Sequence, residues 1–125
     1  MESQDKTRKS KTGIAHIWHA FLYSVEGVSA AFRHETAFRL EVLLAVILIP
    51  TALLLPANGT GKALMLASVL LVLVVELINS AIEAVVDRIS PEYHPLAKRA
   101  KDFGSAAVLV SLINVTLIWT LVMFA

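Results

Sequence analysis

Three long apolar segments dominate the chain, and short polar stretches separate them. The first runs from about Leu40 to Leu55, the second from near Lys62 to about Ile89, and the third from about Phe103 to Ala125. Apolar runs of about 18 residues or more are typical of helices that cross a membrane. The first segment is short, so we expect its helix to include a turn from the preceding residues. The pattern predicts an all-α membrane protein with three transmembrane helices.

A different pattern lies before these segments, between Ile14 and His34. Apolar residues recur at intervals of three or four, beginning with Ile17 and Phe21, and more polar residues take the other side. An N-terminal amphipathic helix lying on the membrane surface fits this pattern. An ordinary helix packed against protein fits it equally well. Residues 1–13 are polar and basic, and we expect them to form a disordered tail.

Composition narrows the class of protein. Hydrophobic residues make up 57% of the 125 residues, which indicates a single integral-membrane domain at 14–125. The net charge of only +1 argues against a nucleic-acid-binding protein. Cysteine is absent, which excludes disulfides and cysteine-based metal or redox chemistry.

The placement of basic residues predicts an orientation. Four of them lie in the N-terminal tail, and Arg88, Lys98, Arg99 and Lys101 lie between the second and third segments. The turn between the first and second segments has only Lys62. Because basic residues concentrate in cytoplasmic loops, we expect a cytoplasmic N-terminus and a periplasmic C-terminus.

The second apolar segment carries a polar stripe in its C-terminal half. At about 100° per residue, Glu83 and Asp87 each fall within about 20° of Glu76 around the helix, and Asn79 and Ser80 lie nearby. Glu76 lies about 21 Å from the start of the segment, inside a hydrocarbon core about 30 Å thick, and Glu83 lies about 10 Å further on. Ionisable groups at this depth are functional candidates. The alternative is a structural hydrogen bond between helices.

Further carboxylates lie where they could approach this stripe. Glu35 and Glu41 stand at the start of the first segment, and Lys101 and Asp102 stand just before the third. Carboxylates that converge from three segments suggest a Mg²⁺ site, because Mg²⁺ prefers oxygen ligands and commonly bridges phosphates. Phosphoryl transfer needs positioning, charge neutralisation and a base, and none of these requires a phosphate-binding loop. The stretch Gly59–Lys62 lacks two positions of such a loop, and we interpret it as a turn.

Four ordered motifs contain these candidates: ETAFRLE at 35–41, ELINSAIEAVVDR at 76–88, EYH at 92–94 and AKDFGSAA at 100–107. Together they resemble the signature of the prokaryotic diacylglycerol kinase family, and the resemblance covers about Ile14 to Ala125. It implies ATP-dependent phosphorylation of diacylglycerol to phosphatidic acid, with Mg²⁺, at the cytoplasmic face of the bacterial inner membrane. It also implies a homotrimer whose active sites are shared between neighbouring subunits.

The resemblance implies a role for each matching residue. Glu76 would be the general base beside the lipid, and Glu35 and Glu83 would hold both the metal and the nucleotide. The other nucleotide-binding residues would be His16, Tyr23, Glu92, Tyr93, His94, Lys101 and Asp102. The other substrate-binding residues would be Ala37, Phe38, Arg39, Leu40, Glu41, Ser105 and Trp119. Asn79 and Asp87 match positions that support activity in an unknown role.

The sequence departs from the family pattern at one position, and two alternative functions remain open. The family carries an arginine where this chain has His16, and a histidine would be a weaker or pH-dependent phosphate donor. Residues 90–98 are similar to the undecaprenol kinase branch, whereas residues 101–105 are similar to the diacylglycerol branch, so undecaprenol kinase is one alternative. A small non-enzymatic transporter subunit with a proton-coupling Glu is the other. A transporter would not need Glu35 and Lys101 gathered at one face.

Overall fold

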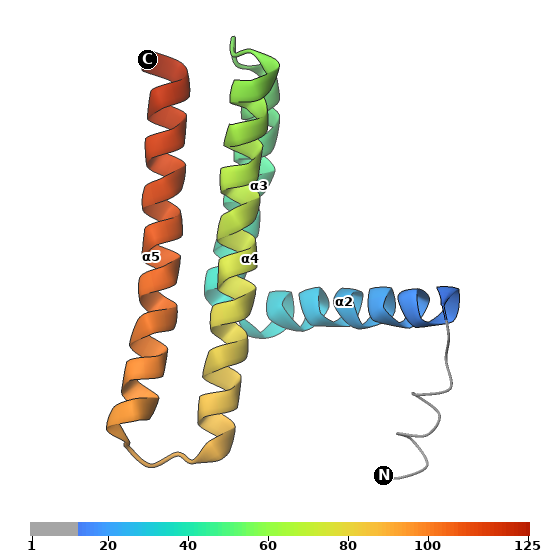
Figure 1. The fold of residues 1–125 in the computed structure, drawn as a ribbon, viewed down its shortest axis with the longest axis vertical. Helices are drawn as coiled ribbons and strands as arrows, with labels where there is room; N and C mark the ends of the chain where they lie inside the picture. Colours follow the sequence, from blue (N-terminus) through green and yellow to red (C-terminus); the bar gives the residue numbers. More distant parts are fainter. Residues whose placement is uncertain (1–12) are drawn as a thin grey trace.

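The computed structural model describes residues 13–125, and within this range the chain is all-helical (Figure 1). Its helices are α2 (Ile14–His34), α3 (Thr36–Leu54), α4 (Gly59–Ile89) and α5 (Pro95–Phe124). The basic tail that the sequence predicts at residues 1–13 lies, apart from Gly13, outside the described residues. The helix predicted between Ile14 and His34 is present with those bounds.

Three of these helices, α3, α4 and α5, are long and apolar enough to cross a membrane, which confirms the prediction of three candidate spans. They run side by side in Figure 1, and α4 contacts both of its neighbours. Helix α3 begins at Thr36 and so includes the extra turn that the short apolar segment needed. Its 19 residues make about 28 Å of helix, close to the thickness of a hydrocarbon core.

Helix α5 begins earlier than the sequence analysis expected. Its first residue is Pro95 rather than about Phe103, so the connector from α4 is only Ser90–His94. His94 caps the helix by accepting a hydrogen bond at Nδ1 from the Leu96 backbone N–H at 3.1 Å, and proline is well suited to the first turn. The expectation was wrong because the first two turns are polar, and apolar runs alone do not reveal them.

The opposite end of the bundle is closed by the turn between α3 and α4. The Asn58 side chain caps α4 by accepting a hydrogen bond from the Gly61 backbone N–H at 2.7 Å. Lys62 Nζ donates to the Leu53 carbonyl at 2.7 Å and satisfies an acceptor at the end of α3. The stretch Gly59–Lys62 is therefore the first turn of α4, and our interpretation of it as a connecting turn was wrong.

The buried face of α4 changes character along its length. Met65, Val69, Val72, Glu76 and Asn79 are all buried and follow each other at intervals of three or four residues. This spacing keeps one face of the helix against its neighbours. The same face that packs through methyl and methylene groups near the start of α4 presents a carboxyl and an amide further along.

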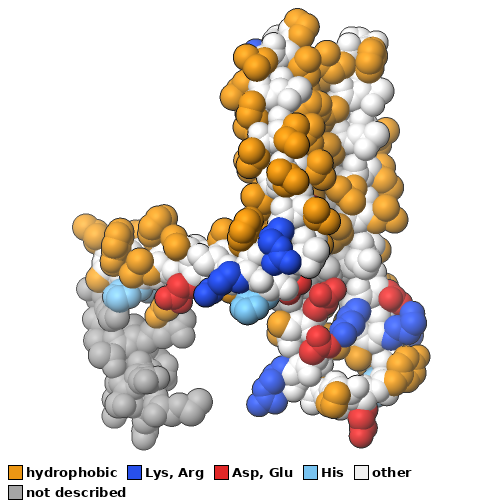
Figure 2. All heavy atoms as spheres, turned by 180° about the vertical axis from the view of Figure 1, so that it is seen from behind, with side chains coloured by type: hydrophobic (Ala, Val, Ile, Leu, Met, Phe, Trp, Pro, Cys, Tyr) orange, Lys and Arg blue, Asp and Glu red, His pale blue; other side chains and the backbone are white. Residues whose placement is uncertain are grey.

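Helix α2 leaves the bundle at the point where α3 begins and points away to the side (Figure 1). Figure 2 shows hydrophobic side chains along one side of α2 and charged or histidine side chains along the other. Arg39 fixes the corner, because its Nη1 donates to the carbonyls of Phe32 at 2.9 Å and Arg33 at 3.0 Å. Its Nη2 donates to Thr36 Oγ1 at 3.1 Å.

Candidate active site

A pair of carboxyl groups joins α3 to α4 inside the bundle. The side chains of Glu41 and Glu76 lie within hydrogen-bonding reach of each other. Glu76 is only 5% exposed, and Glu41 Oε2 is buried without a hydrogen-bond partner among the described residues. Two carboxylates at this spacing repel each other unless a proton or a cation lies between them. The pair can therefore accept and hold a proton.

Asn79 and Glu83 continue this polar face by one and two turns of α4. The Asn79 amide Nδ2 donates to Glu83 Oε1 at 3.4 Å, and Asn79 itself is only 8% exposed. Glu35 at the α2–α3 corner and Glu83 both lie close enough to add negative charge around Glu76. Glu35, Glu41 and Glu83 are thus near enough to Glu76 for their charges to act on it, although Glu83 lies two turns of α4 further along.

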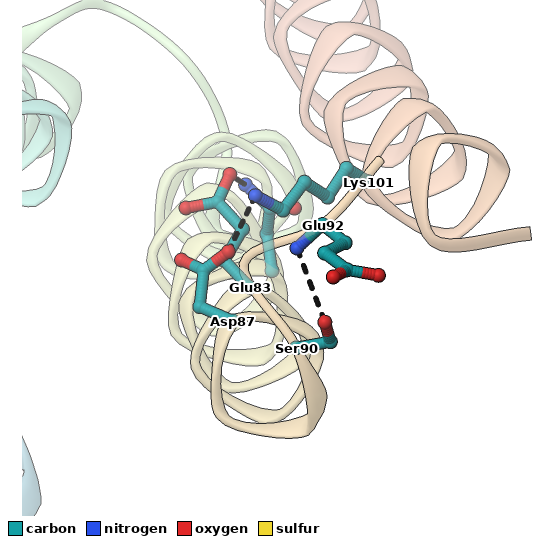
Figure 3. Close-up of polar contacts among 6 residues, drawn as sticks. Glu83, Asp87, Ser90, Glu92 and Lys101 are labelled. Atoms are coloured by element: carbon teal, nitrogen blue, oxygen red, sulfur yellow. Dashed lines mark hydrogen bonds and ion pairs between the residues drawn. The ribbon is translucent and has the colours of Figure 1, made fainter. Parts of the chain in front are cut away.

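The hairpin between α4 and α5 adds charged groups of both signs. Lys101 Nζ reaches across from α5 and donates to Asp87 Oδ1 on α4 at 2.6 Å, as Figure 3 shows. In the same view Glu83 lies on α4, one turn before Asp87. Lys98 Nζ pairs with Asp102 Oδ2 at 2.6 Å. Both ion pairs are well exposed, so they contribute little to stability and can rearrange around an incoming phosphate.

The connector holds three further residues that the resemblance assigns to the nucleotide. The Glu92 backbone N–H donates to Ser90 Oγ at 3.1 Å, which shapes the turn and leaves the Glu92 carboxylate outside that bond (Figure 3). Tyr93 is 78% exposed. His94 uses Nδ1 to cap α5, so its ring is held at the helix start. All three stand on the same connector, a few residues before Lys101.

A cavity of about 540 Å³ lies between α2 and α4. Its lining includes Ser24 and Gly27 of α2, Glu35 at the corner and Ser80 of α4. Ser80 Oγ is buried and makes no hydrogen bond to the described residues. This volume lies within the range of small-molecule sites, and it opens beside the carboxylates. Tyr23 immediately precedes Ser24 on α2.

The described residues do not form a complete metal site in one chain. No three His, Asp or Glu side chains in residues 13–125 are grouped closely enough to hold a metal ion. Mg²⁺ that accompanies a nucleotide needs less, because one or two carboxylates, waters and the phosphates complete its shell. Glu83, held by Asn79 and partly open to solvent, and Glu35 at the mouth of the cavity suit that smaller requirement.

The residues assigned to the lipid do not form one cluster. Phe38 is buried, whereas Ala37 and Leu40 are exposed on α3 and Ser105 is exposed on α5. Trp119 lies 14 residues after Ser105, about 21 Å along α5, and its buried Nε1 has no partner in residues 13–125. His16 is equally remote, because 19 residues of α2, about 28 Å, separate it from Glu35.

Sequence reasoning missed two contacts. It placed Glu41 near the start of the first span but did not predict its contact with Glu76, which depends on how α3 packs against α4. It used Lys98 only to predict the orientation of the chain and did not predict its ion pair with Asp102. The four-residue spacing of Lys98 and Asp102 on a helix was the signal that could have revealed the pair.

Fold and site together define a class: a small integral-membrane enzyme whose carboxylates gather where three apolar helices give way to a polar end. The model of the prokaryotic diacylglycerol kinase family matches residues 22–123. The chain belongs to this family.

Relatives agree over nearly the whole chain. A diacylglycerol kinase of Pseudomonas aeruginosa is 54% identical over 115 residues, which is 92% of this chain and 94% of the relative. A diacylglycerol kinase of Haemophilus influenzae is 48% identical, over 90% of this chain and 96% of the relative. A diacylglycerol kinase of Escherichia coli is 44% identical, over 91% of this chain and 93% of the relative. Neither undecaprenol kinase nor a transporter subunit is favoured by these relatives.

Proposed function

We propose that the chain transfers the γ-phosphate of ATP to the free hydroxyl of diacylglycerol and so produces phosphatidic acid. The observation that carries this proposal is the buried Glu41–Glu76 carboxyl pair, because it stands where α4 passes from its apolar to its polar half. From Gly59 to Glu76 is about 26 Å of helix, nearly the thickness of the hydrocarbon core. A lipid hydroxyl just below the headgroups lies at that depth. The relatives named diacylglycerol kinase support the same substrate.

Glu76 acts as the general base in this proposal. It takes the proton of the lipid hydroxyl while the hydroxyl oxygen forms a bond to the γ-phosphorus, and the bond from that phosphorus to the β,γ-bridging oxygen breaks to release ADP. Burial makes a carboxylate a better proton acceptor than it is in water. Glu41, in contact with Glu76, is placed to share the proton that Glu76 receives.

Glu35 and Glu83 are the residues that would hold Mg²⁺ with the nucleotide. When bound, Mg²⁺ neutralises charge on the phosphates during transfer. Lys101 carries the positive charge that a phosphate oxygen needs, and it lies close enough to Glu83 to interact with its charge. Tyr23 on α2, His16 further along it, and the residues of the connector complete the nucleotide site in this proposal.

The apolar lengths and the charges support a placement in the bacterial inner membrane. Helices α4 and α5 extend beyond the level at which α2 leaves the bundle, and their charged residues gather in that extension (Figures 1 and 2). We place this end in the cytoplasm, with α2 lying on the cytoplasmic surface and its hydrophobic side toward the lipid. The N-terminus is then cytoplasmic and the C-terminus periplasmic.

A homotrimer explains what one chain leaves incomplete. Within the chain His16 lies far from Glu83, and Glu41 and Ser80 each leave a buried oxygen without a partner in residues 13–125. Buried polar atoms without partners are costly inside a membrane, and packing between subunits relieves that cost. In the proposed trimer each active site combines α2 and the carboxylates of one subunit with groups of a neighbour.

Purified protein in mixed micelles tests the proposed activity directly. ATP consumption and labelled lipid product are measured with diacylglycerol, with undecaprenol and without lipid. We expect phosphatidic acid from diacylglycerol, little product from undecaprenol and no lipid-independent ATP consumption. Faster phosphorylation of undecaprenol, or no lipid product at all, contradicts the proposal.

A further inference from the structure

Gly104 on α5 lies directly against the side chain of Asn79 on α4. Gly104 is buried, and a Cβ atom built at this position meets the Asn79 carbonyl oxygen Oδ1 well inside van der Waals distance and lies 3.1 Å from Asn79 Cγ. Even an alanine at position 104 therefore requires the Asn79 amide to move. Gly104 is one of five glycines in the chain, and no other has such a contact.

The amide that Gly104 contacts points its other end at the proposed metal-nucleotide site. Asn79 Nδ2 donates to Glu83 Oε1, whereas Asn79 Oδ1 is buried and makes no hydrogen bond to the described residues. This orientation of the amide follows from charge, because the reverse would turn its oxygen toward the Glu83 carboxylate. Oδ1 thus lies in the space that the missing side chain of Gly104 leaves open beside α5.

We propose that Gly104 is a positioning residue for the nucleotide site, acting through Asn79 on the Glu83 carboxylate. The missing side chain leaves room for Oδ1 between the two helices, so that the Asn79 amide keeps the orientation in which Nδ2 donates to Glu83. This inference rests on the proposed function for the role of Glu83, but the contact between Gly104 and Asn79 does not. It gives a physical role to Asn79, which the resemblance left open.

Gly61 provides a matched control at the other end of the same helix pair. A Cβ atom there lies 3.0 Å from Val122 Cγ1 of α5 and 3.2 Å from Asn58 Oδ1. An alanine at position 61 would therefore also crowd the contact between α4 and α5. Gly61 stands 18 residues from Asn79 on α4, about 27 Å away. Gly61→Ala therefore disturbs helix packing without reaching Glu83.

Side-chain amide spectra report the contact without any need for activity. The chain has three asparagines, Asn58, Asn79 and Asn114, so selective ¹⁵N labelling gives three assignable amide groups. In full-length protein in micelles, Gly104→Ala should shift the Asn79 signals, Gly61→Ala should shift those of Asn58, and Asn114 should stay unchanged in both. Unchanged Asn79 signals in Gly104→Ala overturn the proposal.

Kinetics then test the link to Glu83. Gly104→Ala should raise the apparent KM for Mg-ATP about tenfold, the scale of one lost hydrogen bond to a charged group, and leave the KM for diacylglycerol unchanged. Gly61→Ala should lower Tm and change neither KM. Equal KM values for Mg-ATP in the two variants refute the positioning role. If wild-type protein does not phosphorylate diacylglycerol, the proposed function fails, and the spectra still decide the contact.

A double-mutant cycle identifies the residue through which Gly104 acts. In an Asn79→Ala background, Gly104→Ala should have no further effect on the KM for Mg-ATP, because the obstructed amide is gone. If the two substitutions instead raise the KM for Mg-ATP by factors that multiply, Gly104 and Asn79 act independently, and the proposed coupling between them is refuted. If Gly104→Ala alone does not assemble, the double variant still decides the question, since recovered assembly supports the contact and continued failure contradicts it.

Discussion

At each end of the α4–α5 pair a glycine of one helix lies against a side chain of the other, but the chemistry of the two ends is opposite. At the turn end, Gly61 lets α4 approach Val122, and the buried residues that follow are apolar. At the connector end, Gly104 lets α5 approach Asn79, and the buried residues beside it include Glu76. Close packing at the turn end holds two helices together. At the connector end the same close packing also orients an amide and a carboxylate.

The difference follows from what a bilayer allows. Helices inside lipid associate through van der Waals contact, which the apolar turn end supplies. Polar atoms at membrane depth need partners, and Glu41 Oε2, Asn79 Oδ1 and Ser80 Oγ find none within the described chain. The turn end is therefore held mainly by the fit of apolar side chains. The connector end instead leaves groups open to substrates and to neighbouring subunits.

The largest expected effect comes from removing the proposed base. Glu76→Gln should lower kcat by about 10² to 10⁴-fold, because proton abstraction is lost, while a non-hydrolysable ATP analogue still binds. Met65→Ala at the turn end is the control, since Met65 is fully buried on the same face of α4. It should cost about 2 to 5 kcal/mol of stability and leave the KM values of the folded enzyme unchanged. Wild-type turnover in Glu76→Gln contradicts the assignment.

A second effect should separate the metal-nucleotide residues from the base. Glu83→Gln and Glu35→Gln should each raise the apparent KM for Mg-ATP by about tenfold or more, and excess Mg²⁺ should restore part of the activity. Titration of the ATP analogue with the variants measures this directly. If Glu76→Gln abolished analogue binding and Glu83→Gln did not, the two roles would have to be exchanged.

Mixed assemblies test whether the connector end is completed by a neighbour. Glu76→Gln and Asp102→Asn should each be inactive alone. Co-assembled, they should recover a fraction of wild-type activity, because some shared sites then contain no altered residue. Activity is measured after the two variants are unfolded, mixed and refolded together. An absence of recovery in mixtures shown to contain both chains argues for a site within one subunit.

The smallest expected effect concerns the corner between α2 and α3. Arg39→Ala removes hydrogen bonds to two carbonyls of α2 and should lower stability by about 1 kcal/mol. It should also lower activity several-fold, because α2 forms one wall of the cavity. Arg33→Ala is the matched control, since Arg33 donates to the Ser29 carbonyl of its own helix α2 and so does not tie α2 to α3. A raised KM for lipid with unchanged Tm in Arg39→Ala would instead support direct lipid binding.

Much of the fold was predictable because its elements are local. Apolar length determines which segments can cross a membrane, and helical periodicity placed Glu76, Asn79, Glu83 and Asp87 on one face before any packing was considered. The start of α5 was missed even though its signals are also local. His94 before Pro95 marks a helix start, but the polar residues that follow hid it from a criterion based on apolar runs.

Contacts between helices could not be predicted in the same way. Whether Glu41 meets Glu76, whether Lys101 reaches Asp87, and which residue of α5 stands against Asn79 depend on how far each helix slides and turns along its neighbour. Apolar side chains that face lipid and apolar side chains that face another helix are nearly equivalent in the sequence, because lipid and protein interiors are similarly apolar. The sequence by itself therefore determined the spans and the polar stripe. Only the tertiary structure decided the register of the helices, which brings Gly104 against Asn79 and Glu41 against Glu76.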